Sequence, residues 1–423
     1  CAFVDEEIFD DDDDDDDQDD QDEAELSDVV SHDWADLVIT GPPRSPGSGT
    51  SSRGRTLSTP PSALRATVSE HQIVRECAAA ATTTTAPRSA SALSLPTWEQ
   101  ISVPAEATLY DLDFDTEQHG YLVGAKGTFL ETVDGGKSWK PRTFANLPED
   151  EEVGYRFEKV SFKNGEGWVV GKPAILLHTT DAGKTWERIP LSPKLPGEPT
   201  GVIALGDKKA EMTTSTGSIY VTENAGRNWK AQVKETIDAT LNRVSSSGVS
   251  GASYFTGQVS NVRRDAKSGE YLAVSSRGNF YLTWTPGQDF WIPHNRQTPR
   301  RIQSMGFVND DANQGLWMTL NGGTLAVAGD AALTEETPNF QEAKLNSGGY
   351  GILDVAWKNK DEVWAVGGGG TMYVSTDGGK NFNFDKSADK IPGNLYTVRF
   401  FNENTGFCLG SDGVLLKYTG LAV

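Results

Sequence analysis

Arginine residues are concentrated in one window of this 423-residue chain, and their chemistry is the most distinctive that the sequence offers. The window contains eight basic residues, seven of them arginine: Arg243, Arg263, Arg264, Lys267, Arg277, Arg296, Arg300 and Arg301. Only Asp265, Glu270 and Asp289 oppose them, so the window between Leu241 and Arg301 carries a formal charge of +5. A planar guanidinium grips carboxylates with two parallel hydrogen bonds and stacks on aromatic rings. The composition therefore favours a surface that binds an anionic partner.

Three interpretations of these arginines are open. A solvated surface without a role does not explain the preference for arginine over lysine. Nucleic-acid binding is disfavoured, because residues 98–423 hold 39 Asp and Glu against 32 Lys and Arg and would repel phosphates. A docking surface for an anionic protein or lipid head group is the interpretation that we adopt.

A second group of residues forms a turn that recurs along the chain. Its clearest copies span residues 132–139, 179–186 and 375–382, and a weaker copy spans residues 222–229. The pattern Thr-x-Asp-x-Gly-x-x-Trp resembles the Asp-box turn of sialidases and other propellers, in which Asp accepts backbone N–H groups and Trp packs between blades. Because it recurs in most units, we predict a structural role for its residues: Asp134, Trp139, Asp181, Trp186, Trp229 and Asp377.

A glycosidase of the sialidase type is the main enzymatic alternative. Sialidases share the Asp-box turns and use three arginines to grip a carboxylate, and the sequence Arg188-Ile189-Pro190 is reminiscent of one of their signatures. Arg188 follows an Asp-box Trp in an outer strand, however, whereas the sialidase signature belongs to an opening strand. Glu270 and Tyr271 are neighbours, but neighbouring strand residues face opposite ways and cannot act as an acid and a nucleophile on one substrate. We therefore predict no catalytic residue.

Metal and cofactor chemistry has no support in the sequence. The three cysteines are Cys1, Cys77 and Cys408, and the five histidines are scattered, so no cluster has the spacing of a zinc site. No stretch approaches the ~20 apolar residues of a membrane span. We predict neither a cofactor nor a bound metal.

The elements that position these residues follow from an internal repeat of roughly 45 residues. The aromatic ends of the repeat fall at Trp139, Trp186, Trp229, Trp291, Phe340 and Phe382, with steps of 47, 43, 62, 49 and 42 residues. A period of this length with several short strands per unit is typical of a β-propeller, in which each unit is one blade. The long step indicates an insertion in the fourth blade.

Glycine-rich turns inside the repeat give the number of blades. Seven such turns occur but only six aromatic ends, and the missing end lies at residues 96–101, which mirror residues 184–189. The sequence therefore predicts an all-β fold, a seven-bladed propeller with four-stranded blades. The N-terminal strand is expected to complete the last blade, whose other strands lie within Leu395–Tyr418.

This topology brings distant arginines together. In a four-stranded blade, the turn between the second and third strands lies on the same face as the connection to the next blade. Arg277 occupies such a turn, and Arg296, Arg300 and Arg301 lie in or near the connection from blade four to blade five. Residues 239–256 form the insertion and would bring Arg243 to the same face. Arg263 and Arg264 lie near the end of an innermost strand. Because successive side chains of a strand point to opposite faces of the sheet, these two are expected to point in different directions.

The N-terminal region differs from the propeller in composition. Residues 1–97 hold 21 Asp and Glu against 6 Arg, a net charge of −15. We expect residues 1–40 to form an acidic disordered segment and residues 41–94 to be a Ser/Thr/Pro/Ala-rich linker or targeting remnant, followed by the propeller at 95–423. Small residues within 82–94 suggest a processing site.

One run of residues resembles a known family. Residues 271–281, Trp284, residues 291–296 and residues 300–307 are similar to the photosystem II stability/assembly factor family, and the likeness extends over the whole propeller. The resemblance implies a seven-bladed propeller of the thylakoid lumen, in a plastid or a cyanobacterium. It also implies that clustered arginines on one face bind early photosystem II intermediates, including the unprocessed reaction-centre core subunit.

The family's arginine role is carried over by position to Arg277, Arg296, Arg300 and Arg301, and less securely to Arg243, Arg263 and Arg264. The resemblance thus implies a non-catalytic assembly factor, a monomer held at the membrane through its partner and without affinity for nucleic acid. The acidic residues 1–40 depart from ordinary transit peptides, which are poor in acids. A general propeller interaction module unrelated to photosynthesis is the other alternative.

Overall fold

The computed structural model describes residues 97–145, 154–233, 258–330, 332–333, 338–386 and 390–420. The predicted acidic segment 1–40, the predicted linker 41–94 and the whole insertion at 239–256, including Arg243, lie outside these ranges. No helix within the described ranges is long and apolar enough to cross a membrane.

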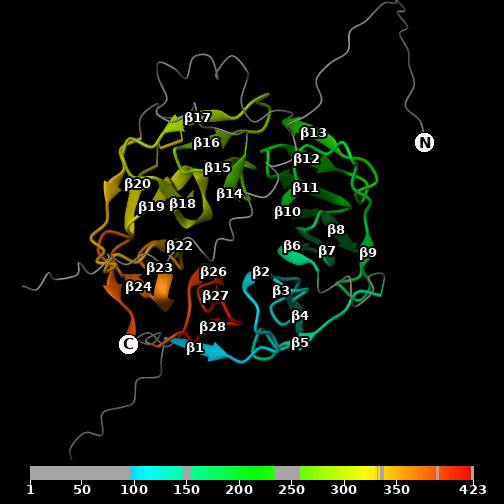
Figure 1. The fold of residues 1–423 in the computed structure, drawn as a ribbon, viewed down its shortest axis with the longest axis horizontal. Helices are drawn as coiled ribbons and strands as arrows, with labels where there is room; N and C mark the ends of the chain where they lie inside the picture. The colour runs from blue at the N-terminus through cyan, green and yellow to red at the C-terminus, as the bar shows by residue number, and fades with distance from the viewer. Residues whose placement is uncertain are drawn as a thin grey trace, which may run out of the picture. The chain divides into compact units, whose positions relative to one another are not determined.

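Seven four-stranded antiparallel sheets are arranged as blades around a central axis (Figure 1), which confirms the predicted propeller. Each blade runs from an innermost strand to an outermost one. The first three blades contain β2 (Leu109–Phe114), β3 (Gly120–Gly124), β4 (Phe129–Thr132) and β5 (Lys140–Pro141); β6 (Arg156–Lys163), β7 (Glu166–Lys172), β8 (Ile175–Thr179) and β9 (Glu187–Arg188); and β10 (Pro199–Gly206), β11 (Lys209–Thr214), β12 (Ile219–Thr222) and β13 (Lys230–Val233).

The next three blades follow the same order. They contain β14 (Val259–Arg264), β15 (Tyr271–Ser275), β16 (Phe280–Trp284) and β17 (Ile292–Asn295); β18 (Ile302–Phe307), β19 (Leu316–Leu320), β20 (Thr324–Ala328) and β21 (Gln341–Glu342); and β22 (Ile352–Trp357), β23 (Val363–Gly367), β24 (Met372–Ser375) and β25 (Asn383–Phe384). Three short 3-10 helices lie in the turns of blades five and six: η3 (Val308–Asp310), η4 (Ala312–Gln314) and η5 (Gly368–Gly370).

The seventh blade joins the two ends of the described chain, as predicted. Its inner strands are β26 (Leu395–Asn402), β27 (Thr405–Gly410) and β28 (Leu415–Tyr418), and its outermost strand is β1 (Trp98–Ile101). The register pairs Trp98 with Tyr418 and Ile101 with Leu415. Closure of this kind leaves no unpaired inner strand that could recruit another chain.

Side chains of several innermost strands link their blade to the next one. A carboxylate oxygen of Asp111 on β2 accepts the backbone N–H of Val160 on β6 at 3.2 Å. Asp354 on β22 accepts the N–H of Val398 on β26 at 3.0 Å in the same way. Ser161 and Asn261 make equivalent bonds to the third and fifth blades. Because these bonds satisfy backbone donors that would otherwise be buried without a partner, they hold neighbouring blades in register.

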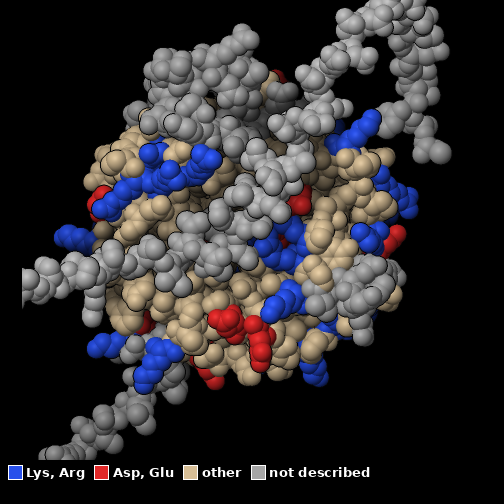
Figure 2. Space-filling view, viewed as in Figure 1, with Lys and Arg blue, Asp and Glu red and all other residues tan. Residues whose placement is uncertain are grey.

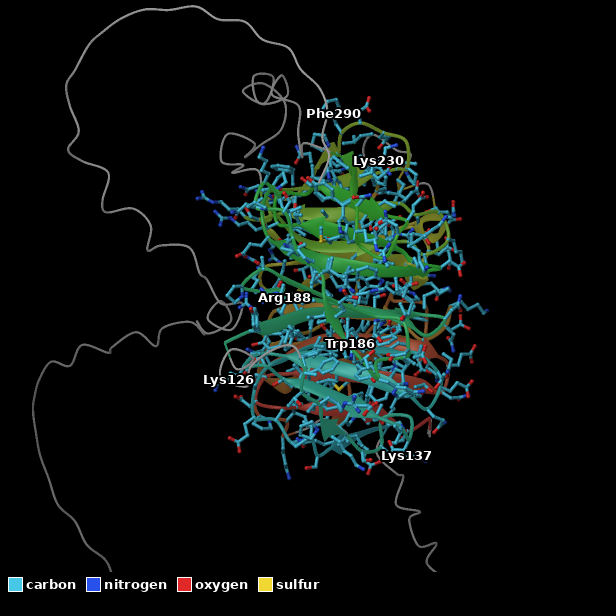
Figure 3. All side chains as sticks on the ribbon, turned by 90° about the vertical axis from the view of Figure 1, so that its right-hand side faces the viewer. Lys126, Lys137, Trp186, Arg188, Lys230 and Phe290 are labelled. Atoms are coloured by element: carbon cyan, nitrogen blue, oxygen red, sulfur yellow. The ribbon has the colours of Figure 1, made fainter. Side chains whose placement is uncertain are left out.

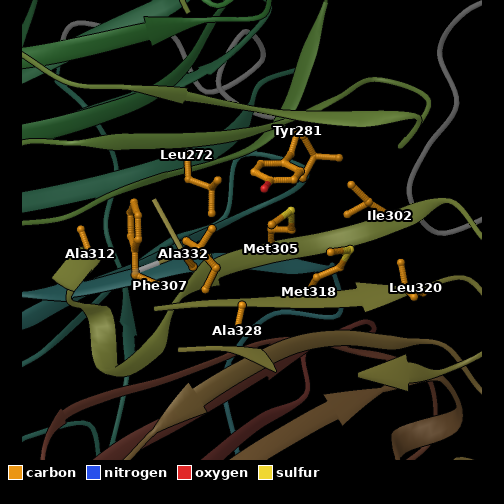
Figure 4. Packing of buried hydrophobic residues seen from close by; sticks show 12 residues of the cluster. Leu272, Tyr281, Ile302, Met305, Phe307, Ala312, Met318, Leu320, Ala328 and Ala332 are labelled. Carbon is orange, nitrogen blue, oxygen red and sulfur yellow. The ribbon is translucent and has the colours of Figure 1, made fainter. Parts of the chain in front are cut away.

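Apolar cores lie between neighbouring blades. Figure 4 shows the cluster between the fourth and fifth, in which Leu272 and Tyr281 of one blade meet Met305 and Met318 of the next. The aromatic residue that ends each repeat packs on the preceding blade. Trp186, for example, lies edge-on to Tyr121 and Phe129 of the first blade at centroid distances of 5.9 and 5.4 Å. This geometry confirms the inter-blade packing that the repeat predicts.

The ring has two distinct faces, which Figure 3 shows in side view. Lys126, in a turn between second and third strands, projects on one side, whereas Lys137, in an Asp-box turn, projects on the other. We call the first side the connection face, because it also carries the connections between blades, and the second side the Asp-box face.

Candidate functional site

Arg277 lies on the connection face in the turn between β15 and β16. Gly278 closes this turn with φ +64°, and its carbonyl oxygen accepts the backbone N–H of Ile302 at 2.8 Å. A Cβ atom at position 278 would lie 2.0 Å from the carbonyl oxygen of Ile302, so only glycine permits this approach. The contact places Arg277 beside Arg301, the residue that precedes Ile302.

Arg296 is held inside the connection from β17 to β18. Its Nη1 donates to the carbonyl oxygen of Asn279 at 2.6 Å and to Oδ1 of the same residue at 3.2 Å. Its Nε donates to the carbonyl oxygen of Thr298 at 2.7 Å, and its Nη2 to that of Pro299 at 3.4 Å. Burial, together with the charge of Arg301, lowers the pKa of this guanidinium. Arg296 therefore fixes the backbone that carries the next two arginines.

Arg300 and Arg301 are exposed on this connection. The Arg300 guanidinium donates to the hydroxyl of Thr324 at the start of β20. The carbonyl oxygen of Arg301 accepts the N–H of Asn321 at 2.9 Å, which fixes its backbone against the turn of the fifth blade. Within the described ranges, the side chains of Arg277 and Arg301 make no hydrogen bond or ion pair.

These four residues, Arg277, Arg296, Arg300 and Arg301, form what we call the arginine cluster. Figure 2 shows a run of Lys and Arg atoms over the blades of β14–β17 and β18–β21. The turn between β15 and β16 and the connection from β17 to β18 carry the four arginines to the boundary between these two blades. The structure thus brings together arginines up to 24 positions apart in the sequence (Arg277 to Arg301). Mutual repulsion of uncompensated cations makes such a surface favourable for an anionic ligand.

Arg263 and Arg264 do not lie in the arginine cluster. Arg263 donates to the buried Asp354 of the sixth blade at 2.6 Å and lies over the ring of Trp317. Arg264 grips both carboxylate oxygens of Glu211 in the third blade, at 2.6 and 3.3 Å. The predicted difference in direction is confirmed, and both guanidinium groups join blades instead of facing the surface that carries Arg277.

The Asp-box residues adopt the predicted turn geometry. In the second blade, Asp181 accepts the backbone N–H of Thr185 at 2.9 Å and the hydroxyls of Thr185 and Thr179 at 2.7 Å each. The N–H of Thr185 is the main cause that lowers the pKa of Asp181 from its ordinary value to about 2. Asp134 and Asp377 accept corresponding bonds, and their pKa values are also lowered. These carboxylates are committed to their own turns.

The Asp-box aromatic residues lie at blade interfaces. Trp139 and Trp186 are buried, whereas Trp229 is half-buried and lies edge-on to Trp168 at 5.9 Å. The structural role predicted for these turns agrees with this arrangement.

The residues considered for glycoside chemistry do not converge. Arg188 is exposed on the outermost strand β9. Glu270 accepts hydroxyl groups from Ser268 and Thr285, whereas the hydroxyl of the adjacent, buried Tyr271 donates to Glu211 at 2.7 Å. Their different partners show that the two side chains point apart. In the described part of the chain, no group of His, Cys, Asp and Glu could hold a metal ion.

Two residues of this region were missed by sequence reasoning. Asn279 provides two acceptors for Arg296, and its only sequence signal is its position directly after the Arg277-Gly278 turn. Tyr350 is half exposed on the connection face near Thr324, and the glycine pair before it is its only signal.

Comparisons of the chain with family models, with related sequences and with solved structures all indicate the same family. The family model described as "Photosynthesis system II assembly factor YCF48" matches residues 90–419. A relative from Guillardia theta, "Photosystem II stability/assembly factor HCF136, chloroplastic", is 60% identical over 325 residues, which are 76% of this chain and 82% of that protein.

Two solved structures are similar as well. "YCF48 from Cyanidioschyzon merolae" is 52% identical with a TM-score of 0.72, and the match covers 77% of this chain and all of that one. "YCF48 bound to D1 peptide" is 42% identical with a TM-score of 0.67, and the match covers 77% of this chain and 96% of that one. The resemblance seen in the sequence is confirmed: the chain belongs to the photosystem II assembly factor YCF48 family.

Proposed function

We propose that this protein is a non-catalytic assembly factor for photosystem II, which binds early reaction-centre intermediates through the arginine cluster. The observation that carries the proposal is the set of three exposed guanidinium groups, Arg277, Arg300 and Arg301, on one face of a closed ring. A related structure is titled as a YCF48 bound to a D1 peptide, which supports a polypeptide ligand.

The partner of this protein would be the reaction-centre core subunit, in its unprocessed form and within early assembly complexes. The name of the Guillardia theta relative includes "chloroplastic", which supports a plastid location. We place the protein at the lumenal side of the thylakoid membrane, held there through its partner.

Within the cluster, the four arginines have different roles. Arg277 and Arg301 would contact carboxylates of the partner directly, because their side chains are exposed. Arg300 would do so after releasing Thr324. Arg296 is a positioning residue, since its donors are already used to hold the backbone of Thr298 and Pro299. Arg263 and Arg264 have acidic partners within the ring and are left out of the proposed surface.

A scaffold role agrees with the physical properties of the ring. Paired guanidinium and carboxylate groups at an exposed surface attract at long range and are screened by salt, so binding should weaken as ionic strength rises. A closed ring of packed blades loses little conformational entropy when it docks. The relatives bear the names of stability and assembly factors, which agrees with the absence of catalysis from this proposal.

The test of the proposed function is capture of photosystem II intermediates from solubilised thylakoids by the full chain. The variant Arg277→Glu together with Arg301→Glu should lose capture, because it reverses two exposed charges that face the partner. The matched control is Arg227→Glu together with Lys184→Glu, which makes the same charge change at exposed Asp-box turns on the opposite face.

Each outcome has a clear meaning. Loss of reaction-centre precursors by the first variant alone would support the arginine cluster as the binding surface. Equal capture by both variants would move the site elsewhere on the ring. If the unaltered chain captures no photosystem II subunit, the proposal is wrong, and the alternatives of a general interaction module and a glycosidase are favoured instead.

A further inference from the structure

An uncharged strip borders the arginine cluster on the connection face. It is formed by the turn between β19 and β20, the part of the connection from β21 to β22 that follows the exposed Lys344, and the turn that contains η5. We call it the tyrosine strip, and its exposed residues are Asn321, Gly322, Asn346, Gly348, Gly349, Tyr350 and Gly369. None of these side chains carries a charge, so the strip differs sharply from the adjoining cluster.

Tyr350 is the one large side chain of the strip, and the backbone presents it outward. A tight turn forms before it, in which its N–H donates to the carbonyl oxygen of Ser347 at 3.1 Å. Its ring lies against the backbone of Gly369, because a Cβ atom at that position would be 2.9 Å from Cε1 of the ring. The residue remains 50% exposed. One side of the ring thus packs on the backbone of Gly369, and the other side is exposed to solvent. The ring is therefore ordered before a partner binds.

The strip and the cluster are contiguous through short contacts. Arg300 donates to the hydroxyl of Thr324, and Thr324 follows Gly323. A Cβ atom on Gly323 would lie 2.1 Å from the carbonyl oxygen of Tyr350. Gln303, two residues after Arg301, also lies close to Gly351, the residue that follows Tyr350. A Cβ atom on Gly351 would be only 3.0 Å from the side-chain amide of Gln303. One bound segment can therefore touch Tyr350 and the exposed arginines together.

We propose that the connection face binds an extended peptide segment of the partner that has two features: a carboxylate, held by Arg277 and Arg301, and an apolar side chain, packed on Tyr350. This inference rests on the proposed function and specifies the chemistry of its ligand. Charge complementarity identifies the anionic end, and the uncharged strip identifies the apolar end.

Physical reasons favour a ligand with both features. Exposed ion pairs contribute little free energy and are screened by salt, so the cluster alone would give weak contacts. An aromatic ring adds a large apolar contact area with few rotatable bonds, and such residues dominate the energy of many interfaces. The glycines around Tyr350 let a backbone approach closely, and the exposed side chains of the strip itself carry no charge that would have to lose its water.

The experiment compares capture of photosystem II intermediates by the full chain and three single variants. Tyr350→Ala should reduce capture at least about fivefold, which corresponds to the loss of more than about 1 kcal/mol expected for an interface anchor. Tyr350→Phe should retain capture, since it keeps the ring. Phe384→Ala is the matched control, because Phe384 is 44% exposed but lies on the outermost strand β25.

Salt dependence separates the two halves of the surface. The capture that Tyr350→Ala retains should still fall with added salt, whereas any residual capture by Arg277→Glu together with Arg301→Glu should depend less on salt. If Tyr350→Ala captures normally while the arginine variant fails, the tyrosine strip has no role and the proposed function stands. If the unaltered chain captures nothing, the proposed function itself has failed.

A peptide competition then tests the form of the ligand. Synthetic Gly/Ser peptides that contain Glu and Leu at varied spacings are compared with peptides that contain only one of the two. Competition by the two-feature peptides alone is the expected result. If Tyr350→Ala lowers capture but no peptide competes, the ligand is a folded surface and the extended segment is wrong. If Tyr350→Ala loses binding only to phosphatidylglycerol vesicles, the strip contacts lipid instead.

Discussion

At the scale of single residues, four arginines that share one surface differ in what their guanidinium groups already bind. Arg296 has hydrogen bonds to Asn279, Thr298 and Pro299, and its role is to shape a loop. Arg277 and Arg301 are exposed and keep their donors for a ligand. A substitution at Arg296 should therefore act through the fold, whereas one at Arg277 should act through binding alone.

Replacing Arg296 tests this difference. Arg296→Ala should lower the free energy of unfolding by about 1–3 kcal/mol, because several carbonyl acceptors lose a charged donor. Amide exchange of residues 297–301 should accelerate, and capture should weaken as a consequence. Urea unfolding and hydrogen-exchange mass spectrometry measure both effects, with Arg277→Ala as the control that changes neither. An unchanged exchange rate at 297–301 would contradict the positioning role.

At the scale of elements, the Asp-box turns are small units whose carboxylates serve the backbone. The third blade has Asn224 where the second has Asp181, and Asn224 still accepts the N–H of Asn228 at 2.9 Å. The turn therefore needs an acceptor oxygen more than it needs a charge. The charge adds a dependence on pH that the third blade lacks at this position.

Acid should weaken the Asp181 turn. The pKa of Asp181 is lowered in the folded protein to about 2. The ionised carboxylate therefore stabilises the fold at every pH above the ordinary pKa of an aspartate. That contribution is lost as the pH falls through the ordinary value near 3.9 toward about 2. Asp181→Asn should flatten the free energy of unfolding against pH across this interval, as measured by urea titrations at several pH values. A slope identical to that of the unaltered protein would count against this source of acid sensitivity.

Packing between blades depends on the aromatic residue at the end of each repeat. Trp186 is buried against Tyr121, Phe129, Phe144 and Phe162 of the first two blades. Trp186→Ala should lower the free energy of unfolding by about 3–5 kcal/mol, the range for a large aromatic residue removed from a core. Phe290→Ala, at a 42% exposed position, is the control and should change it little. An unchanged melting temperature of Trp186→Ala would show that the interface does not depend on this ring.

At the scale of the whole molecule, β1 closes the ring. Trp98 is buried among Trp364, Phe400 and Tyr418, so this strand connects the last blade to the sixth as well as completing a sheet. Both surfaces of the connection face depend on closure, because the arginine cluster and the tyrosine strip lie across blade boundaries.

Deleting residues 97–101 should open the ring. The deletion exposes the edge of β28 and the apolar surface under Trp98, so we expect a lower melting temperature and self-association. Light scattering coupled to size-exclusion chromatography measures the second effect. Glu99→Ala changes an exposed residue of the same strand and should leave a monomer. A deleted chain that stays monomeric with an unchanged melting temperature would show that β1 is dispensable for closure.

The sequence by itself determined the number of blades, the closing strand and the structural role of Asp134, Asp181 and Asp377. These features depend on contacts within about ten residues or on a repeated spacing, which the chain displays directly. It also placed Arg277 beside the β17–β18 connection, because the two faces of a propeller follow from strand order alone.

Only the tertiary structure decided which arginines are available for a partner. Arg263 meets Asp354 across 91 positions, Arg264 meets Glu211 across 53, and no local pattern marks either pair. The exposure of Tyr350 likewise depends on Gly369, which belongs to a different blade element. Side chains of the same type become structural or functional according to long-range neighbours, and those neighbours are fixed only when the ring closes.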